Sequence, residues 1–392
     1  MEERYIKAID PDKWIRPAGW LTMPTITSSQ NKLAFLFAVY ANEENCMAIS
    51  YGSSTCNYDV DWGDGTTLNV INTVATQSKR YDYASISSIV LQDRFGIDYK
   101  QVIITVTLNS GVNTIWSINA AVVRAGKSQI LESIISHSHS VSFLGRISTM
   151  MQSLKIVKLV PIATVSTHFA NLIALRNFEG FENIDTTSTT TSGTVFANMG
   201  PVWQPLNFTW NSGAGAMTGI LAGCRMKKFG NMTFNGSGGL STAMSPNPSL
   251  EEIGNLNLGN HNTLTQMLQN CFNLQKIGTI TANGSAPNLS SVFQNCYSLQ
   301  EIVFTNAANV TVTTLAFANC HALRRLVLPG ITVAVSIVNA CMQKTALVEL
   351  FTSLGTPGVL TNITITGNPG IPDLTAADYL IATSKNWSVI IV

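Results

Sequence analysis

Five charged residues recur at one position of a repeated pattern, and they are the first candidates for chemistry. They alternate in sign along the chain and are Glu252, Lys276, Glu301, Arg325 and Glu349. Glycoside hydrolysis needs two carboxyl groups ~5–9.5 Å apart, but here a basic residue stands between successive glutamates. We therefore predict no catalytic residue in this set. We expect a ladder of opposite charges that fixes the register of neighbouring strands.

Other residues of metal-binding type are too few or too scattered to form a centre. Asp61 and Asp64 raise the possibility of calcium, which takes six or more oxygen ligands, but the two supply too few, so a structural turn is favoured. His137 and His139 form an isolated pair. The other histidines occupy unrelated repeat positions, and the cysteines contain no Cys-x-x-Cys pair. The sequence predicts no metal and no cofactor. The remaining histidines are His168, His261 and His321.

The charged residues belong to units of about 24 residues that recur between residues 148 and 350. A fixed period of this length indicates a solenoid, in which each unit buries its apolar face against its neighbours. Taking Phe293 as an anchor, apolar residues at offsets −4, 0, +3 and +6 match one face of an α-helix. Beyond +9 the pattern alternates as a strand does. We therefore predict a helix, a turn and a strand per unit, with the strands forming a parallel sheet.

The apolar column of this repeat contains aromatic residues and cysteines. Phe293 and Phe317 are anchors, and the cysteines three residues after the anchors are expected to face inward. A buried thiol behaves as a small hydrophobe, so the cysteines are expected to have a structural role. The inward cysteines are Cys224, Cys271, Cys296, Cys320 and Cys341. Whether Cys46 and Cys56 form a disulfide is left open.

The repeats resemble the BspA-like leucine-rich repeat family. The resemblance rests on Phe-x-Asn-Cys at Phe293–Cys296 and Phe317–Cys320, each followed by the Leu-x-x-Ile/Leu spacing. It covers roughly residues 148–350 and implies a curved α/β solenoid used for adhesion and surface display. It does not imply catalysis.

Residues 25–120 are predicted to form a separate all-β module. Strand segments separated by turn residues are expected at 35–40, 47–51, 58–62, 88–92 and 102–108. Trp62-Gly63-Asp64-Gly65 is the strongest motif, because glycine permits positive φ and Asp64 can cap turn amides. This motif resembles the signature of PKD-like domains, which implies an immunoglobulin-like sandwich. Residues 121–147 are assigned to a linker and an N-terminal cap.

Residues 1–24 contain tryptophans and prolines without periodicity, which suggests an extended arm. Trp and Arg are favoured anchors of interfaces, so Trp14, Arg16 and Trp20 are candidates for docking the chain onto a partner. The alternative is an arm that packs on its own domain.

The repeat phase fades after Glu349, and residues 351–392 are predicted to form a C-terminal cap. A strand is expected at 361–366 and a helix at 374–382. Thr375 stands near the expected N-cap and Asp378 three residues later, a capping-box spacing. A strand at 387–392 is expected to close the chain.

Composition narrows the classes of partner. Only 11% of residues are charged and the net charge is +1, so nothing attracts this chain to nucleic acid. Abundant Thr, Ser and Asn suit a particle surface or a surface that meets sugars. No apolar run is long enough to span a membrane, so no membrane insertion is expected. We also expect no secretory signal at the N-terminus.

An Arg-Pro-x-x-Trp-Leu segment, a Trp-Gly-Asp-Gly module and these repeats together resemble bacteriophage structural proteins. The resemblance implies a non-enzymatic virion protein, assembled in the host cytoplasm beside capsid, collar or tail proteins. Its role would be capsid decoration or contact with a host glycan or protein, and a homo-oligomer is compatible with either. One alternative is an exported bacterial cell-surface adhesin, and another is a virion-associated glycan depolymerase.

Overall fold

The computed structural model describes residues 14–41, 45–51, 57–71, 77–93, 96–110, 116–119, 130–138, 141–144, 151–159, 164–165, 169–184, 191–192, 195–202, 206–211 and 216–391. Two compact units are present. The first contains Met1–Thr186 and Asn198–Gln204, and the second contains Thr187–Ala197 and Pro205–Val392. A region of mixed β-sheet comes first in the chain, and a β-solenoid of about nine turns follows over residues ~132–390.

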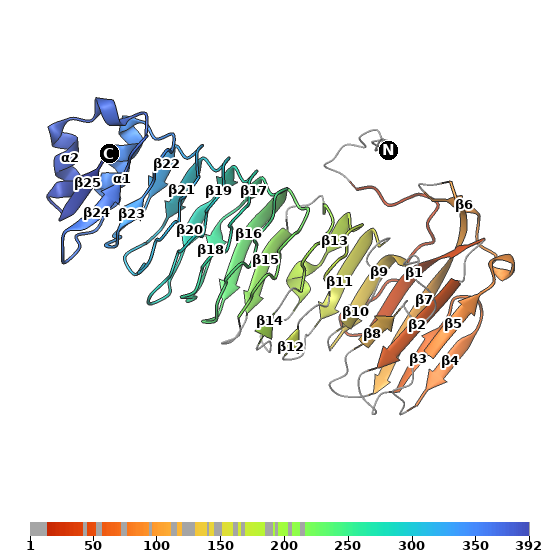
Figure 1. The fold of residues 1–392 in the computed structure, drawn as a ribbon. Helices are drawn as coiled ribbons and strands as arrows, with labels where there is room; N and C mark the ends of the chain where they lie inside the picture. Colours follow the sequence, from red (N-terminus) through yellow and green to blue (C-terminus); the bar gives the residue numbers. More distant parts are fainter. Residues whose placement is uncertain are drawn as a thin grey trace. The chain divides into compact units, whose positions relative to one another are not determined.

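The first unit is built on an eight-stranded mixed sheet (Figure 1). Its central strand β1 (Lys32–Tyr40) is almost wholly apolar and buried, because other strands flank it on both edges and both of its faces are covered. The other strands are β3 (Asn57–Asp61), β4 (Thr67–Val70), β6 (Leu91–Gln92), β7 (Asp98–Ser110), β9 (Ile130–His137), β11 (Ser153–Leu159) and β13 (Asn177–Glu179).

A smaller four-stranded sheet accompanies it. The strands are β2 (Asn45–Tyr51), β5 (Gln77–Tyr81), β8 (Trp116–Asn119) and β10 (Val141–Leu144). Two short 3-10 turns, η1 (Tyr83–Ser85) and η3 (Phe181–Asn183), also lie in this unit. The strands predicted within residues 35–108 are thus present, the one near 88–92 being shorter than expected.

Strand β9 marks the change from antiparallel to parallel pairing. It pairs antiparallel with β1 and parallel with β11, which in turn pairs parallel with β13. Parallel pairing of successive segments is the arrangement that a solenoid requires, since every turn runs in the same direction. The first turns of the solenoid therefore extend the N-terminal sheet within the same unit.

The second unit continues the solenoid with an eight-stranded parallel sheet, whose strands lie side by side in Figure 1. They are β15 (Leu206–Asn211), β16 (Lys228–Asn235), β17 (Glu252–Ile253), β18 (Leu256–Asn257), β19 (Lys276–Ile277), β20 (Thr279–Thr281), β21 (Glu301–Phe304) and β22 (Arg325–Val327). A three-stranded sheet joins β23 (Val335–Ser336), β24 (Thr361–Thr364) and β25 (Trp387–Ile390). Two further short strands are β12 (Thr164–Val165), which belongs to the first unit, and β14 (Thr191–Ser192), which belongs to the second.

The prediction of a helix in each repeat is wrong, because the −4 to +3 segments are chains of turns. In one turn the N–H groups of Leu289, Ser291, Phe293 and Asn295 donate to carbonyls of the following turn instead of their own. Ser291 and Asn295 have φ of 55° and 64°, a conformation that an α-helix excludes. The chain is therefore mostly β and is not an α/β leucine-rich repeat.

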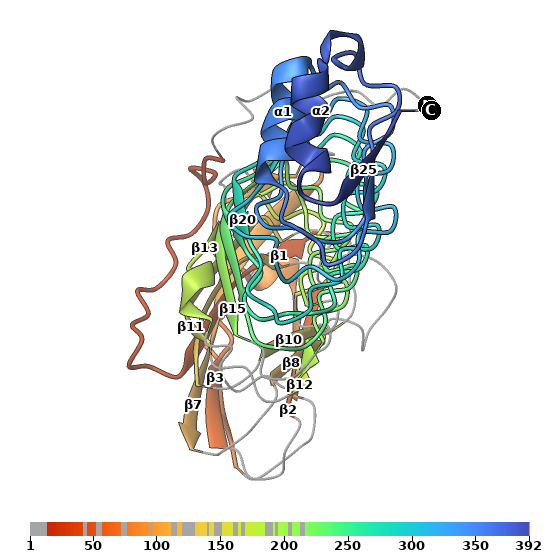
Figure 2. The same cartoon turned by 90° about the vertical axis from the view of Figure 1, so that its left-hand side faces the viewer.

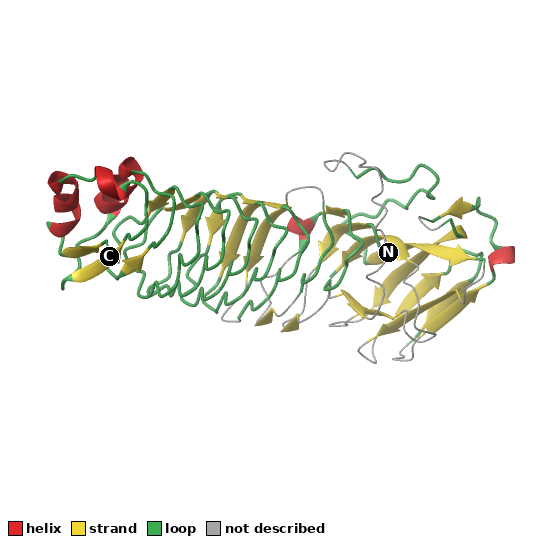
Figure 3. Cartoon of the chain, turned by 45° about the horizontal axis from the view of Figure 1, so that its top comes forward, coloured by secondary structure: helices red, strands yellow, loops and turns green. Residues whose placement is uncertain are grey.

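The α-helices of the described chain lie near its C-terminal end, as Figures 2 and 3 show, and the helical segments drawn red elsewhere in Figure 3 are the 3-10 turns η1 and η3. The α-helices are α1 (Lys344–Ser353) and α2 (Ala376–Thr383), with a 3-10 turn η4 (Ile371–Asp373) between them. The predicted capping box is confirmed, since Thr375 and Asp378 cap the start of α2 reciprocally. Lys385 donates to the carbonyls of Phe351, Thr352 and Leu354, and so stabilises the C-terminal end of α1.

The last repeat departs from the predicted phase. Val338, the expected anchor, is 38% exposed, and Cys341, expected inward, is exposed. Ile337 and Met342 are buried instead. The spacing from Phe317 to Val338 is three residues shorter than the usual 24. Residues at the usual offsets in this repeat therefore do not line up with the inward residues of the preceding turn.

The other repeat cysteines form the expected buried column, and their thiols also act as donors. Cys224, Cys296 and Cys320 place Sγ 3.1–3.2 Å from the carbonyl oxygen of the anchor residue one turn earlier, while Cys271 does so at 3.7 Å. Burial raises the pKa of Cys271 and of Cys320 to about 12, and it also raises the pKa of Cys296 well above its ordinary value. These thiols therefore stay protonated, which suits packing and not metal ligation.

Thiol reactivity tests this column. We expect an alkylating reagent at pH 8 to modify Cys341 at least about tenfold faster than Cys271, Cys296 or Cys320 in the folded chain, because buried protonated thiols are poor nucleophiles. Mass mapping after timed labelling measures this, and labelling in denaturant serves as the control. Equal rates for Cys296 and Cys341 in the folded chain would contradict the structure.

Candidate functional site

The charged column forms two ion-paired ladders on the second unit. In one, Glu252 lies 3.0 Å from Lys228 and 3.7 Å from Lys276. In the other, Arg325 lies 3.6 Å from Glu301 and 2.6 Å from Glu349. Glu349 was expected on a strand, but it lies on α1 and still meets Arg325 through two hydrogen bonds.

Between the two ladders the column is interrupted. Within residues 216–391 no ion pair joins Lys276 to Glu301. Strand β21 pairs with β20, beginning at Thr279↔Val303, and not with β19, which carries Lys276. A role of the whole column in fixing register stays a prediction.

The pKa shifts of these carboxylates are opposite to those that acid catalysis requires. Hydrogen bonding from Lys228 lowers the pKa of Glu252, and hydrogen bonding from Arg325 lowers that of Glu349. A general acid in glycoside hydrolysis needs the opposite shift, so that it holds a proton near neutral pH. Both glutamates are therefore held ionised by their basic neighbours.

The fork between Arg325 and Glu349 can be tested by substitution. Arg325→Gln should lower the free energy of unfolding by about 1 kcal/mol, since exposed ion pairs contribute ~0.2–1 kcal/mol each. Arg324→Gln is the matched control, because this neighbouring residue is exposed and has no ion pair within residues 216–391.

Measurements at different salt concentrations and pH values test whether the stability lost in Arg325→Gln is electrostatic. The difference between Arg325→Gln and the unmodified chain should shrink at high salt. Because the folded-state pKa of Glu349 is lowered, its contribution is present above the ordinary value of 4.5 and is lost as the pH falls through the lower folded value. Equal thermal stability of the two variants at neutral pH would show that the fork has no energetic role.

The acidic residues of the Trp-Gly-Asp-Gly turn bind to protein groups. Asp61 accepts from the backbone N–H of Gly63, and Asp64 accepts from both the N–H and the hydroxyl of Thr66. Lys79 lies 2.8 Å from the other oxygen of Asp64. Partial burial alone would raise the pKa of Asp64, but the bonds from Lys79 and Thr66 outweigh it and lower the pKa.

Trp62 and Gly63 complete this turn. Trp62 is buried, and the hydroxyl of Tyr81 donates to its carbonyl at 2.8 Å. Gly63 and Gly65 have φ of 76° and 86°. A side chain on Gly63 would also collide with the carbonyl of Ile103, so glycine is required there on two grounds.

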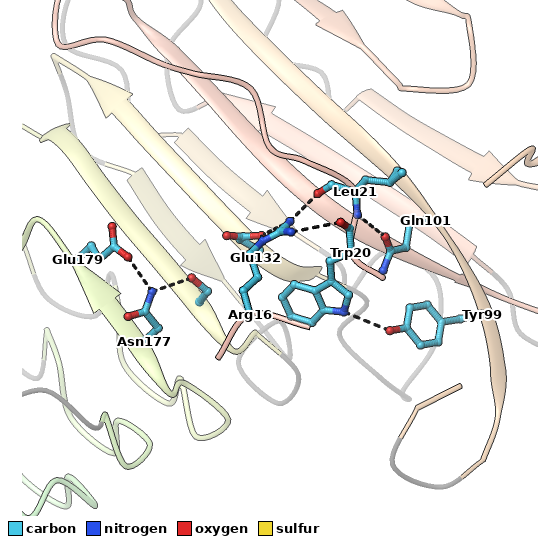
Figure 4. A network of polar contacts seen from close by, with 9 residues as sticks. Arg16, Trp20, Leu21, Tyr99, Gln101, Glu132, Asn177 and Glu179 are labelled. Atoms are coloured by element: carbon cyan, nitrogen blue, oxygen red, sulfur yellow. Dashed lines mark hydrogen bonds and ion pairs between the residues drawn. The ribbon is translucent and has the colours of Figure 1, made fainter. Parts of the chain in front are cut away.

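Two of the candidate docking residues, Arg16 and Trp20, take part in a polar network of the first unit, which Figure 4 shows. Arg16 donates to Glu132 at 2.8 Å and to the carbonyls of Trp20 and Leu21. Trp20 is 6% exposed and packs in a cluster with Leu36 and Tyr99, and Trp14 packs against that cluster. The described part of the arm thus packs on its own unit. Residues 1–13 lie outside the described chain, and docking stays a prediction.

Glu132 is the buried member of this network. Burial raises the pKa of its carboxyl despite the bonds from Arg16. In the adjoining parallel strands Ser153 and Asn177 occupy the paired positions, and Asn177 donates to Ser153 and Glu179 (Figure 4). Arg16 therefore compensates a charge at the start of the solenoid.

Removing that compensation should destabilise the chain. Arg16→Ala should cost up to ~3 kcal/mol, since it leaves a buried carboxylate unpaired. Adding Glu132→Gln should recover much of that loss. Lys155→Gln, which breaks an exposed pair with Glu179, is the control and should change stability by under ~0.5 kcal/mol. A double variant no more stable than Arg16→Ala would contradict this account of Arg16, and chemical unfolding measures all four chains.

Hydroxyl and amide side chains line part of one face of the second unit, and we call this array the Thr/Asn lattice. Partly exposed Val303 stands in register after Thr279 and ends one of its columns. Outward positions along the lattice strands alternate with buried ones, so that Thr233 lies between buried Met232 and Phe234. Every lattice residue is at least partly exposed. The members are Asn207, Thr209, Asn211, Asn231, Thr233, Asn235, Asn255, Asn257, Thr279, Thr281, Asn283 and Thr305.

The lattice side chains are held in columns by bonds between turns. Asn235 donates to Asn211 at 2.8 Å, and the hydroxyls of Thr281 and Thr305 are 3.1 Å apart. In the corner column, Asn231 accepts from the N–H of Asn255 at 2.9 Å. A side chain at Gly254 would lie 2.8 Å from that Asn231 oxygen, so glycine keeps the corner open.

Our sequence prediction missed this lattice, although a signal was present. Asn-x-Thr-x-Asn occurs at residues 207–211 and again at 231–235, and Thr-x-Thr-x-Asn occurs at 279–283. Their spacing equals one or two turns, and alternation of polar and apolar residues places the polar ones on one face of a strand. The helix-like spacing of the apolar residues is the stronger pattern in these repeats, and it does not mark the polar positions.

Other side chains stack on the side of the solenoid formed by the chains of turns around the anchor residues, which we call the turn side. Phe272, Tyr297 and His321 lie nearly parallel, with ring centroids 5.4 and 5.9 Å apart. Beside them Asn319 donates to Asn295, which donates to Asn270, both at 2.8 Å. Tyr297 is thus covered by a ring on both faces, and Phe272 and His321 are each covered by a ring on one face.

Within the described residues, no group of three or more His, Cys, Asp or Glu side chains is placed to hold a metal ion. His137 and His261 are buried, and His261 bonds through Nδ1 to Gly238. His139, His168 and Cys56 lie outside the described residues. Neither α1 nor α2, the helices of the described chain, has the length or apolar content to cross a bilayer.

The comparisons add no relative. No protein-family model matches the chain, and no match was found among the curated proteins or the solved structures.

Proposed function

We propose that this chain is a non-enzymatic structural protein of a bacteriophage particle that displays its solenoid on the particle surface. The observation that carries the display role is the Thr/Asn lattice, an ordered exposed face that repeats over successive turns. Repeated outward columns suit an extended contact surface, as in other solenoids. The virion assignment rests on the resemblance in layout described from the sequence.

The ionised state of the glutamates supports a non-enzymatic role. Glu252 and Glu349 have lowered pKa values and basic partners, whereas glycosidase acids need a raised pKa. We also infer a PKD-like origin for the N-terminal region, supported by the Trp62–Gly65 turn and its bond from Tyr81. We also propose that the repeats are related to the BspA-like family, on the basis of the Phe-x-Asn-Cys motifs at Phe293–Cys296 and Phe317–Cys320.

Immunogold labelling tests the location. Antibodies against the chain should label purified particles, and the labelled position separates capsid decoration from a collar or tail role. Labelling confined to the bacterial envelope in particle-free cultures would contradict the proposal and favour an exported adhesin.

A further inference from the structure

The Thr/Asn lattice differs from the neighbouring columns because it presents polar but uncharged side chains. Its side chains are hydroxyls and amides, and none is charged. The charged columns of the same turns lie before the corner formed by Gly230 and Asn231, on the strands that carry Lys228 and Glu252. A partner recognised through charge therefore finds no complement on this face.

The lattice repeats in two directions. Successive strands are ~4.8 Å apart, and outward residues along one strand are about 6.7 Å apart. Four strands, β15, β16, β18 and β20, carry the middle column from Thr209 to Thr281, and Thr305, directly after β21, continues it. A ligand that uses this regularity must itself offer hydrogen-bonding groups at regular intervals.

The side chains are also preorganised. Bonds from turn to turn fix the Asn235 amide and the Thr281 hydroxyl in place. An amide nitrogen has two N–H groups, so Asn235 retains one donor beyond the one given to Asn211. Fixed side chains lose little entropy on binding.

We propose that the Thr/Asn lattice binds a neutral polysaccharide, whose regularly spaced hydroxyls donate to and accept from the lattice. The ligand class rests on the proposed display of the solenoid. A protein partner fits less well, because protein interfaces are enriched in aromatic residues and Arg at their cores, and the lattice has neither.

Co-sedimentation of the full chain with insoluble cellulose, chitin and β-1,3-glucan tests the proposal. We expect at least one to retain the chain, and retention to survive 1 M NaCl because no ion pair contributes. Thr281→Lys and Thr233→Lys should each weaken retention at least about tenfold, since a lysine removes a hydroxyl and projects a long charged side chain across the face. Thr314→Lys, at an exposed position on the turn side, is the control, and thermal melts establish that each variant folds.

Three results would overturn the proposal. They are no retention by any of the probes, equal retention of Thr281→Lys and Thr314→Lys, or loss of retention in Tyr297→Ala alone. Inhibition of ice recrystallisation without polysaccharide retention would instead assign the lattice to ordered water. Particle labelling is measured separately from retention, so a failure of retention leaves the virion assignment standing, and the two failures are distinguishable.

Discussion

Backbone groups on one turn of the solenoid find their partners on the next, and this constraint governs the rest of the structure. On the turn side, the N–H of Phe293 donates forward to Ala316, while on the strand side the N–H of Arg325 donates back to Gln300. Buried backbone groups without partners are costly, so each turn must match its neighbour closely in length and path. Because successive turns match in this way, side chains at equivalent positions line up in columns.

The columns inside the solenoid show what this register contributes. Phe293 and Phe317 stack with ring centroids 6.1 Å apart, and the Cys296 thiol reaches the Leu268 carbonyl of the turn before. A thiol in this column fills space and also satisfies a carbonyl that turn geometry leaves accessible. Asn247 replaces cysteine in one turn and makes the same kind of bond, to Leu221. In the turns from Cys224 to Cys320 the position thus holds a small inward donor, whereas buried Leu172 and Met199 occupy it in earlier turns.

The sequence predicted the repeat, most of its inward residues and the elements from residue 361 onward, but not the local conformation of each unit, the shifted phase around Val338 and Cys341, or the helix α1. Offsets of −4, 0, +3 and +6 fit a helix, yet they also fit a chain of turns that faces the same core. The distinguishing signal was Asn or Gly two residues after the anchor, as at Asn270, Asn295 and Asn319, all with positive φ. The lattice was missed for a related reason, since polar residues in a strand show their pattern only when turns are aligned. Burial of Trp20 depends on contacts with Tyr99 far along the chain, which local patterns do not show.

Charged side chains and hydroxyl or amide side chains occupy different columns of the solenoid, and this separation limits the kinds of ligand that the lattice can bind. The ion pairs around Glu252 and Arg325 largely neutralise one another, and their fields are screened within ~8–10 Å at physiological salt. Contact with the lattice therefore depends on short-range hydrogen bonds, each contributing ~0.5–1.5 kcal/mol net. Such bonds hold a partner only when many form at once. A regular ligand gains from every additional turn in register, and a linked set of weak contacts gains avidity that no single contact has. The same inter-turn bonding that sets the length of each repeat thus also determines which ligands the face can hold.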